Sequence, residues 1–198
     1  MKRVGLTGGI GCGKSTVVAE MRRQGVSCFV ADEVAARYYD DPLFVAEVAK
    51  SLRMNVCSSD GMVDKRAIAD AVFHDKEKLA RLNSLVHPRV MADYHRWLDN
   101  HADEDLTVFE CAILYEYGLE KQVDVVVTVY LDEEERMRRL ALRDRVSRQE
   151  LELRMRNQIS AEEKMLRADY VILNYEGNPR ERQVKEILNE IKLIDTHK

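Results

Sequence analysis

The sequence predicts an α/β fold, in which helices flank a doubly wound parallel sheet. Short apolar runs alternate along the 198 residues with longer segments of helical periodicity. The apolar runs are rich in Val, Ile and Leu, which is typical of strands that are buried on both faces. The strands are expected at residues 3–7, 27–31, 106–110, 123–131 and 170–173.

A glycine-rich loop follows the first expected strand. Residues 8–15 match G-x-x-x-x-G-K-[ST], the phosphate-binding P-loop, and residues 14–24 predict a helix with Gly25 as its C-cap. The backbone N–H groups of such a loop bind phosphates, while its lysine reaches the β- and γ-phosphates of ATP and its hydroxyl group binds Mg²⁺. The sequence therefore predicts the fold of the P-loop NTPases. The expected ATP-binding residues of the loop are Gly9, Gly11, Cys12, Gly13, Lys14, Ser15 and Thr16, with Ser15 also a metal ligand.

Two segments interrupt the alternation of strands and helices. Residues 41–103 carry helical patterns, which the capping pair Asp41 and Pro42 opens, and no convincing strand. Helices are also expected over residues 63–72 and 79–98. Residues 143–167 contain two capping boxes, which start at Ser147 and Ser160 and predict two short helices. We interpret the chain as one domain with its core at about 1–40, 104–142 and 168–198. The first segment would be a helical acceptor-binding insertion at about 41–103, and the second a helical lid at about 143–167 that excludes water.

The composition limits the classes of partner. A net charge of −4 provides no bulk attraction to nucleic acid, and no apolar run approaches the roughly 20 residues of a membrane span. The first residues enter a strand, so we expect no targeting peptide, no membrane partner and a cytoplasmic location. The four cysteines have no disulfide or zinc spacing and are expected to be free thiols. Cys12 could be sensitive to oxidation, because a helix N-terminus lowers the pKa of a thiol. The sequence makes no prediction of oligomeric state.

Asp32 follows the second expected strand, 18 residues after Lys14. The carboxyl ends of parallel strands lie at one edge of a sheet, so a carboxylate there could orient an acceptor hydroxyl group and receive its proton. It could also bind Mg²⁺, directly or through water. The alternative interpretation is an N-cap for a helix that starts near Glu33, and the two roles are compatible.

Three arginines, Arg136, Arg139 and Arg143, are spaced i, i+3 and i+7 and so share one face of a predicted helix. Arginine suits the negative charge that spreads over the γ-phosphate during transfer, and we assign this role to Arg143, beside the lid. Surface ion pairs with carboxylates are the alternative, which we favour for Arg136 and Arg138. The choice between phosphate and surface roles stays open for Arg139, Arg154 and Arg156.

Two further positions have two interpretations each. His87 precedes Pro88, and the pair is predicted to end a short helix that begins near Lys78, because proline disfavours helical geometry in the preceding residue. A lone histidine there is more often structural, although Asn83 lies four residues earlier and could share a face with it. Glu110 ends the third expected strand as either a Walker-B acid near Mg²⁺ or a solvated strand end.

Taken together, these motifs resemble the dephospho-coenzyme A kinase family nearly end to end. Residues 5–15 are similar to its G-L-T-G-G-I-G-S-G-K-S, with Cys12 in place of the usual serine, and Asp32 matches its catalytic aspartate. Residues 82–90 resemble its L-N-x-x-x-H-P-x-V segment in the acceptor-binding region. The R-x-x-x-R-D motif at the start of the lid and the later A-x-Q, A-D and N-x-G motifs are matched by Arg139, Arg143, Asp144, Gln158, Ala168, Asp169 and Asn174.

The chain departs from the family pattern at three places. Val30 replaces the first acid of D-A-D, and Arg37 stands one position after the usual basic residue, where Ala36 is found. Residues 112–116 keep the glutamate of P-L-L-[FY]-E, Glu116, but lack its proline. None of these changes removes Lys14 or a catalytic residue.

The resemblance implies transfer of the γ-phosphate of ATP to the ribose 3′-hydroxyl of dephospho-coenzyme A, the small-molecule substrate, with Mg²⁺ present. In this interpretation Lys14, Asp32 and Arg143 are catalytic, and Ser15 and Asp32 hold the metal. The resemblance further implies that Arg139 and Asn174 bind ATP, with Asn174 near the adenine, and that Asp32, Asn83 and His87 bind the substrate.

Three alternatives are weighed against this interpretation. A kinase for another nucleotide or small molecule could share the same core. A regulatory GTPase would need a base-reading N-K-x-D motif, which the chain lacks. A nucleotide-binding module without catalysis would have no use for Asp32 and an arginine-rich lid.

Overall fold

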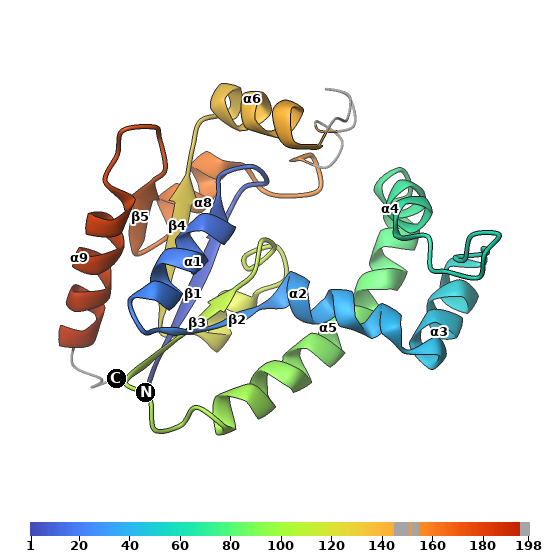
Figure 1. Ribbon diagram of the computed structural model, residues 1–198, viewed down its shortest axis with the longest axis horizontal. Helices are drawn as coiled ribbons and strands as arrows, with labels where there is room; N and C mark the ends of the chain where they lie inside the picture. Colours follow the sequence, from blue (N-terminus) through green and yellow to red (C-terminus); the bar gives the residue numbers. More distant parts are fainter. Residues whose placement is uncertain (145–150, 152–154, 195–198) are drawn as a thin grey trace. The chain divides into compact units, whose positions relative to one another are not determined.

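The computed structural model describes residues 1–144, 151 and 155–194, with side chains 143 and 144 not described (Figure 1). Its contacts form two compact units. One consists of Met1–Val30 together with Leu98–Lys198, and the other of Ala31–Trp97. The first unit is an α/β core and the second is helical.

The core contains a five-stranded sheet in the order β2-β3-β1-β4-β5, and every neighbouring pair is parallel. The predicted fold class is therefore confirmed. The order places β3 between β1 and β2, so the P-loop that follows β1 lies next to the end of β3. The strands are β1 (Lys2–Gly8), β2 (Ser27–Val30), β3 (Leu106–Glu110), β4 (Val125–Tyr130) and β5 (Tyr170–Leu173).

Both faces of the sheet are buried, because alternate side chains of a strand point to opposite sides. One face contributes Val4, Leu6, Val108 and Val127 to a cluster with the apolar side chains of α1 (Lys14–Arg23) and α9 (Arg180–Leu193). On the other face, a Cβ at Gly5 would meet side chains of the loops after β3 and before β4. α8 (Ala161–Arg167) packs on β1 and β4, and α6 (Glu133–Asp144) follows β4 (Figure 1).

The helical unit has its own apolar cluster. Asp41 caps α3 (Pro42–Leu52) by accepting a hydrogen bond from the backbone N–H of Leu43 at 2.9 Å, as its capping pattern predicts. Phe44, Val48 and Leu52 of α3 pack with residues of α4 (Lys65–Phe73) and α5 (Lys76–Asp99). The unit opens with α2 (Ala31–Arg37) and the 3-10 turn η1 (Tyr38–Asp40), while a second 3-10 turn, η2 (Leu119–Gln122), belongs to the core. In the part of the chain that the structure describes, no helix has the length and apolarity of a membrane span.

The helix expected over residues 79–98 is confirmed, and the prediction that His87 and Pro88 end a helix is wrong. α5 continues through Pro88 to Asp99 as a single helix of 24 residues. Val90 and Tyr94 lie beyond Pro88 and are 6% and 1% exposed, so their burial stabilises the continued helix despite the local cost of proline. Tertiary packing therefore overrides the local signal.

Replacing the proline tests this balance. The Pro88→Ala variant is expected to raise the free energy of unfolding by about 1–3 kcal/mol, because alanine supplies an N–H for the Ser84 carbonyl and removes the ring from the helix interior. Urea denaturation measures the change. Pro179→Ala, just before α9, is the matched control and should change stability little. A less stable Pro88→Ala variant would show that the helical unit requires the proline.

Candidate active site

The glycines of the P-loop lie where a side chain would not fit. Gly11 and Gly13 have φ values of 83° and 90°, in the left-handed region that favours glycine. A Cβ on Gly11 would lie 2.7 Å from Cγ of Leu140, and one on Gly13 would collide with the amide of Asn174. The loop geometry therefore depends on glycine for both conformation and close packing.

Lys14 lies against the end of β3. Its ammonium group donates a hydrogen bond to the Gly8 carbonyl at 3.2 Å and is 3.8 Å from the Glu110 carboxylate. Glu110 is 4% exposed and pairs in register with Leu6 of β1. The interpretation of Glu110 as a solvated strand end is therefore wrong, and its carboxylate faces the P-loop lysine.

Asn174 follows β5 and joins the end of that strand to the P-loop. It is 2% exposed, its side-chain amide donates to the Cys12 carbonyl at 2.8 Å, and its side-chain oxygen accepts from Nε of Arg180 at 2.8 Å. Arg139 donates to the Asn174 carbonyl at 3.0 Å. These bonds link α6, β5 and α9 to one side of the loop.

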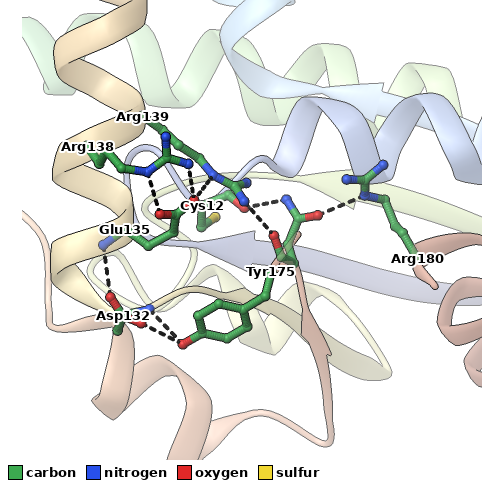
Figure 2. Close-up of polar contacts among 8 residues, drawn as sticks. Cys12, Asp132, Glu135, Arg138, Arg139, Tyr175 and Arg180 are labelled. Atoms are coloured by element: carbon green, nitrogen blue, oxygen red, sulfur yellow. Dashed lines mark hydrogen bonds and ion pairs between the residues drawn. The ribbon is translucent and has the colours of Figure 1, made fainter. Parts of the chain in front are cut away.

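Arg139 also has the carboxylate partner that its spacing suggests. Its Nε donates to Glu135 at 2.7 Å, and Arg138 donates to the same carboxylate at 2.7 Å and 2.8 Å (Figure 2). The two guanidinium groups lower the pKa of Glu135 to about 2. The ion pair expected for Arg138 is therefore present, and Arg139 combines such a pair with a contact to the residue that holds the P-loop.

The surface interpretation of Arg136 is wrong. Arg136 is 4% exposed, and Nη1 of its guanidinium would lie 2.5 Å from a Cβ on Gly9. Asp132, four residues earlier, does not pair with Arg136; it accepts from the N–H of Glu135 and the hydroxyl group of Tyr175 at 2.9 Å each. α6 therefore places a buried guanidinium directly on the P-loop.

The expectation of an acidic thiol at Cys12 is also wrong. Cys12 is fully buried, and burial raises the pKa of its thiol, although the positive charge of Lys14 acts in the opposite direction. Desolvation of the thiolate outweighs the helix N-terminus. Cys12 therefore contributes its backbone and its packing to the loop.

Lys164 of α8 is a buried residue that sequence reasoning missed. It is fully buried, donates to the Ala112 carbonyl and lies 2.9 Å from Glu116. Glu116 also accepts from the backbone N–H of Ile159 at 3.0 Å, and Ser160 caps α8 as predicted. The pair thus ties the segment before α8 to the loop after β3. Of this pair, only Glu116 could be recognised in the sequence, because it belongs to a segment that resembles the family pattern.

The predicted acceptor residues belong to the helical unit. Asp32 lies in the first turn of α2, which begins at Ala31, so the N-cap interpretation is wrong. Asn83 and His87 lie one turn apart on α5. Burial lowers the pKa of His87, which favours its neutral form.

Several predictions fall outside the described residues. α6 includes position 143, but the side chain of Arg143 is not described, nor are Arg154 and the capping box at Ser147; Arg156 is exposed. Within residues 1–144, 151 and 155–194, no group of three or more His, Cys, Asp or Glu side chains is arranged to hold a metal ion.

Sequence comparisons connect the chain with one family. The family model for dephospho-CoA kinase matches residues 2–179. A dephospho-CoA kinase of Aquifex aeolicus is 35% identical over 195 residues, covering 96% of this chain and 98% of that protein. A dephospho-CoA kinase of Leptospira interrogans is 35% identical over 173 residues, covering 86% and 83%.

Solved structures agree with this fold. A protein of Thermus thermophilus is 34% identical and superposes with a TM-score of 0.82, covering 96% of this chain and 97% of that one. A dephospho-CoA kinase from Campylobacter jejuni, at 23% identity, has a TM-score of 0.66 and covers 96% of each chain. A shikimate kinase from Acinetobacter baumannii, at 16% identity, has a TM-score of 0.52 and covers 96% and 93%. The last two show the shared fold.

Loss of the Asn174 side chain should loosen the P-loop. Asn174→Ala is expected to lower the free energy of unfolding by about 1–3 kcal/mol, because the buried Cys12 carbonyl and Arg180 lose a partner. Its affinity for ADP should fall as well. Asn178→Ala removes an exposed side chain with one bond of 3.3 Å to the Leu173 carbonyl and is the matched control. Unchanged stability and ADP affinity in Asn174→Ala would contradict this role.

A further prediction concerns the energetic coupling between Lys164 and Glu116. Glu116→Leu is expected to lower the free energy of unfolding by about 3–5 kcal/mol, because it leaves a buried ammonium group without its carboxylate. The double variant Glu116→Leu/Lys164→Met should recover most of that loss, since apolar replacement of a buried pair is often near neutral. Urea denaturation of both single variants and the double variant measures the coupling. Additive losses would show that the pair does not act as a unit.

Proposed function

The chain belongs to the dephospho-coenzyme A kinase family, and we propose that it transfers the γ-phosphoryl group of ATP to the ribose 3′-hydroxyl group of dephospho-coenzyme A. The products are coenzyme A and ADP, and the reaction completes coenzyme A synthesis. The observation that carries the proposal is the P-loop with Lys14 against the buried Glu110, within a chain that the family model matches over residues 2–179.

The contacts of Lys14 support the proposed donor site. The ammonium group of Lys14 lies 3.2 Å from the Gly8 carbonyl and 3.8 Å from the Glu110 carboxylate, beside the loop. A triphosphate in the loop would supply closer anionic oxygens, and Lys14 would then neutralise the β- and γ-phosphates. The loop N–H groups and the N-terminus of α1 add further donors to phosphate.

The oxygen donors beside the loop fit Mg²⁺. Ser15 presents an exposed hydroxyl group at the start of α1, and Glu110 offers a buried carboxylate beside Lys14. Magnesium prefers oxygen ligands and usually takes one or two from the protein, with phosphate and water completing its shell. We propose Ser15 and Asp32 as residues that hold it, with Glu110 acting directly or through water. When bound, the ion would neutralise charge on the β- and γ-phosphates.

On the acceptor side, we propose that Asp32 accepts a hydrogen bond from the 3′-hydroxyl group and receives its proton late in the transfer. Asn83 and His87 are proposed to bind the acceptor from α5, and the neutral form of His87 has one ring nitrogen that accepts hydrogen bonds and one that donates them. Arg143 is proposed to stabilise the transferring group when residues 143–167 close as a lid, and Arg139 to bind ATP beside Asn174. None of the four cysteines forms a disulfide bond, and we propose a reducing, cytoplasmic location with no nucleic-acid or membrane partner.

The substrate is tested by measuring ADP release with ATP and Mg²⁺ while the acceptor is varied. Dephospho-coenzyme A is compared with a panel of nucleosides, nucleotides and shikimate, and the mass of the product is determined. Turnover restricted to dephospho-coenzyme A, with coenzyme A as the product, would support the proposal. Preference for another acceptor would retain a P-loop kinase and refute the substrate.

The proposed catalytic roles predict how substitutions of these residues change turnover. Lys14→Ala and Asp32→Asn are each expected to lower turnover at least ~10²-fold, because charge stabilisation and positioning carry phosphoryl transfer. Asp40→Asn, in the turn after α2, is the control and should leave turnover near that of the unaltered enzyme. Near-normal turnover of Asp32→Asn at saturating substrate would remove Asp32 from the mechanism.

A further inference from the structure

Lys164 is a buried cation that has no part in the mechanism proposed above. Its side chain is fully buried, and its ammonium group donates to the Ala112 carbonyl and lies 2.9 Å from the Glu116 carboxylate. Burying such a pair removes the hydration of both charges, and apolar side chains in its place are often equally stable. A contribution to stability therefore does not by itself account for a lysine at this position.

The ammonium group of Lys164 lies in the charge environment of the P-loop lysine. Burial lowers the pKa of Lys164, the carboxylate of Glu116 opposes this effect, and the positive charge of Lys14 adds to it. α8, which carries Lys164, packs on β1, the strand that leads into the P-loop. Lys164 is thus close enough to the donor site to influence it.

The Ala112 carbonyl connects Lys164 to the end of β3. β3 ends at Glu110, and the N–H of Cys111 then donates to a carbonyl of β1 at 3.0 Å. One residue further on, the Ala112 carbonyl accepts from the Thr7 hydroxyl group at 3.5 Å and, more closely, from Lys164. The segment that follows Glu110 is therefore held to β1 on one side and to α8 on the other.

We propose that Lys164 is a positioning residue that keeps the Glu110 carboxylate beside Lys14. By holding the Ala112 carbonyl, Lys164 fixes the segment in which β3 ends, and with it the separation of 3.8 Å between the Glu110 and Lys14 groups. Glu116 stabilises the charged form of Lys164. Outer-shell partners of this kind are typical of metal sites, where they orient the groups that bind the ion.

This role of Lys164 rests on the proposed function at one point, the assignment of Glu110 as an oxygen donor toward Mg²⁺. It does not depend on the acceptor. The tests below use only ADP and a metal ion, so a failure of the proposed substrate is distinguishable from a failure of this role.

The first experiment measures by electron paramagnetic resonance how tightly Mn²⁺, used in place of Mg²⁺, binds to the complex of the protein with ADP. The variant is Glu116→Leu/Lys164→Met, which removes both charges together and is expected to keep most of its stability. Its affinity for Mn²⁺ should fall about 10- to 100-fold, the usual cost of losing an outer-shell partner.

Lys2→Met is the matched control. Lys2 is another buried lysine of the core, and it donates at 2.8 Å to the Ile191 carbonyl, at the end of β1 opposite the P-loop. Its loss should leave the Mn²⁺ affinity within about threefold of that of the unaltered protein. If Glu116→Leu/Lys164→Met does not fold, Glu116→Gln/Lys164→Met carries the same measurement, because glutamine still offers an oxygen to the Ile159 N–H.

The second experiment asks whether Lys164 acts through Glu110. Glu110→Gln should itself weaken Mn²⁺ binding, and adding Glu116→Leu/Lys164→Met to it should cost less than about threefold more, because the carboxylate to be positioned has already been removed. Such non-additivity would support the positioning role, which loss of stability alone would not produce.

Three results would overturn the role. An unchanged Mn²⁺ affinity in the double variant would show that the pair serves only the fold. Additive losses with Glu110→Gln would show that Lys164 acts by another route. An unchanged affinity in Glu110→Gln would remove Glu110 from the metal site and, with it, this role of Lys164.

Discussion

The tight packing around the P-loop is the constraint on which the rest of the core depends. A loop that offers N–H groups to phosphate has few of them left to fix its own conformation, and within it the N–H of Cys12 donates to the Gly9 carbonyl at 3.2 Å. Neighbouring elements therefore supply much of the packing that fixes its position. α6 approaches Gly9 and Gly11 through Arg136 and Leu140, and the end of β5 approaches Gly13 through Asn174. The glycines are therefore required on the outer side of the loop as much as on the phosphate side.

Two lysines near this loop differ in their distance from a carboxylate. Lys14 faces Glu110 across 3.8 Å, and Lys164 is closely paired with Glu116 at 2.9 Å. The close pair joins α8 to the loop after β3. Because desolvated charges interact strongly, such a close buried pair contributes to the fold, and we propose that the more distant Lys14 binds phosphate.

The errors of sequence reasoning have a common physical origin. Glu110, Arg136 and Cys12 were judged from their own helix or strand, where a strand end and an i,i+4 pair suggest solvent and a helix N-terminus suggests a reactive thiol. Each is at most 4% exposed, because segments distant in sequence cover it. The prediction that a helix ends at Pro88 was wrong for the same reason, since the burial of residues beyond Pro88 outweighs the local preference of the backbone.

The sequence by itself determined the parallel α/β core, the P-loop and the family, because each depends on local spacing: apolar periodicity, glycines at fixed intervals, and a lysine followed by a serine. Only the tertiary structure decided that β3 lies between β1 and β2, and hence that Glu110 is the strand-end acid adjacent to the P-loop. It also decided that Asn174 holds the Cys12 carbonyl and that Arg136 is buried. The burial and the partners of a charged side chain depend on what packs against it. That information is spread over segments up to 189 residues apart, the separation between Lys2 and the Ile191 carbonyl that its ammonium group contacts.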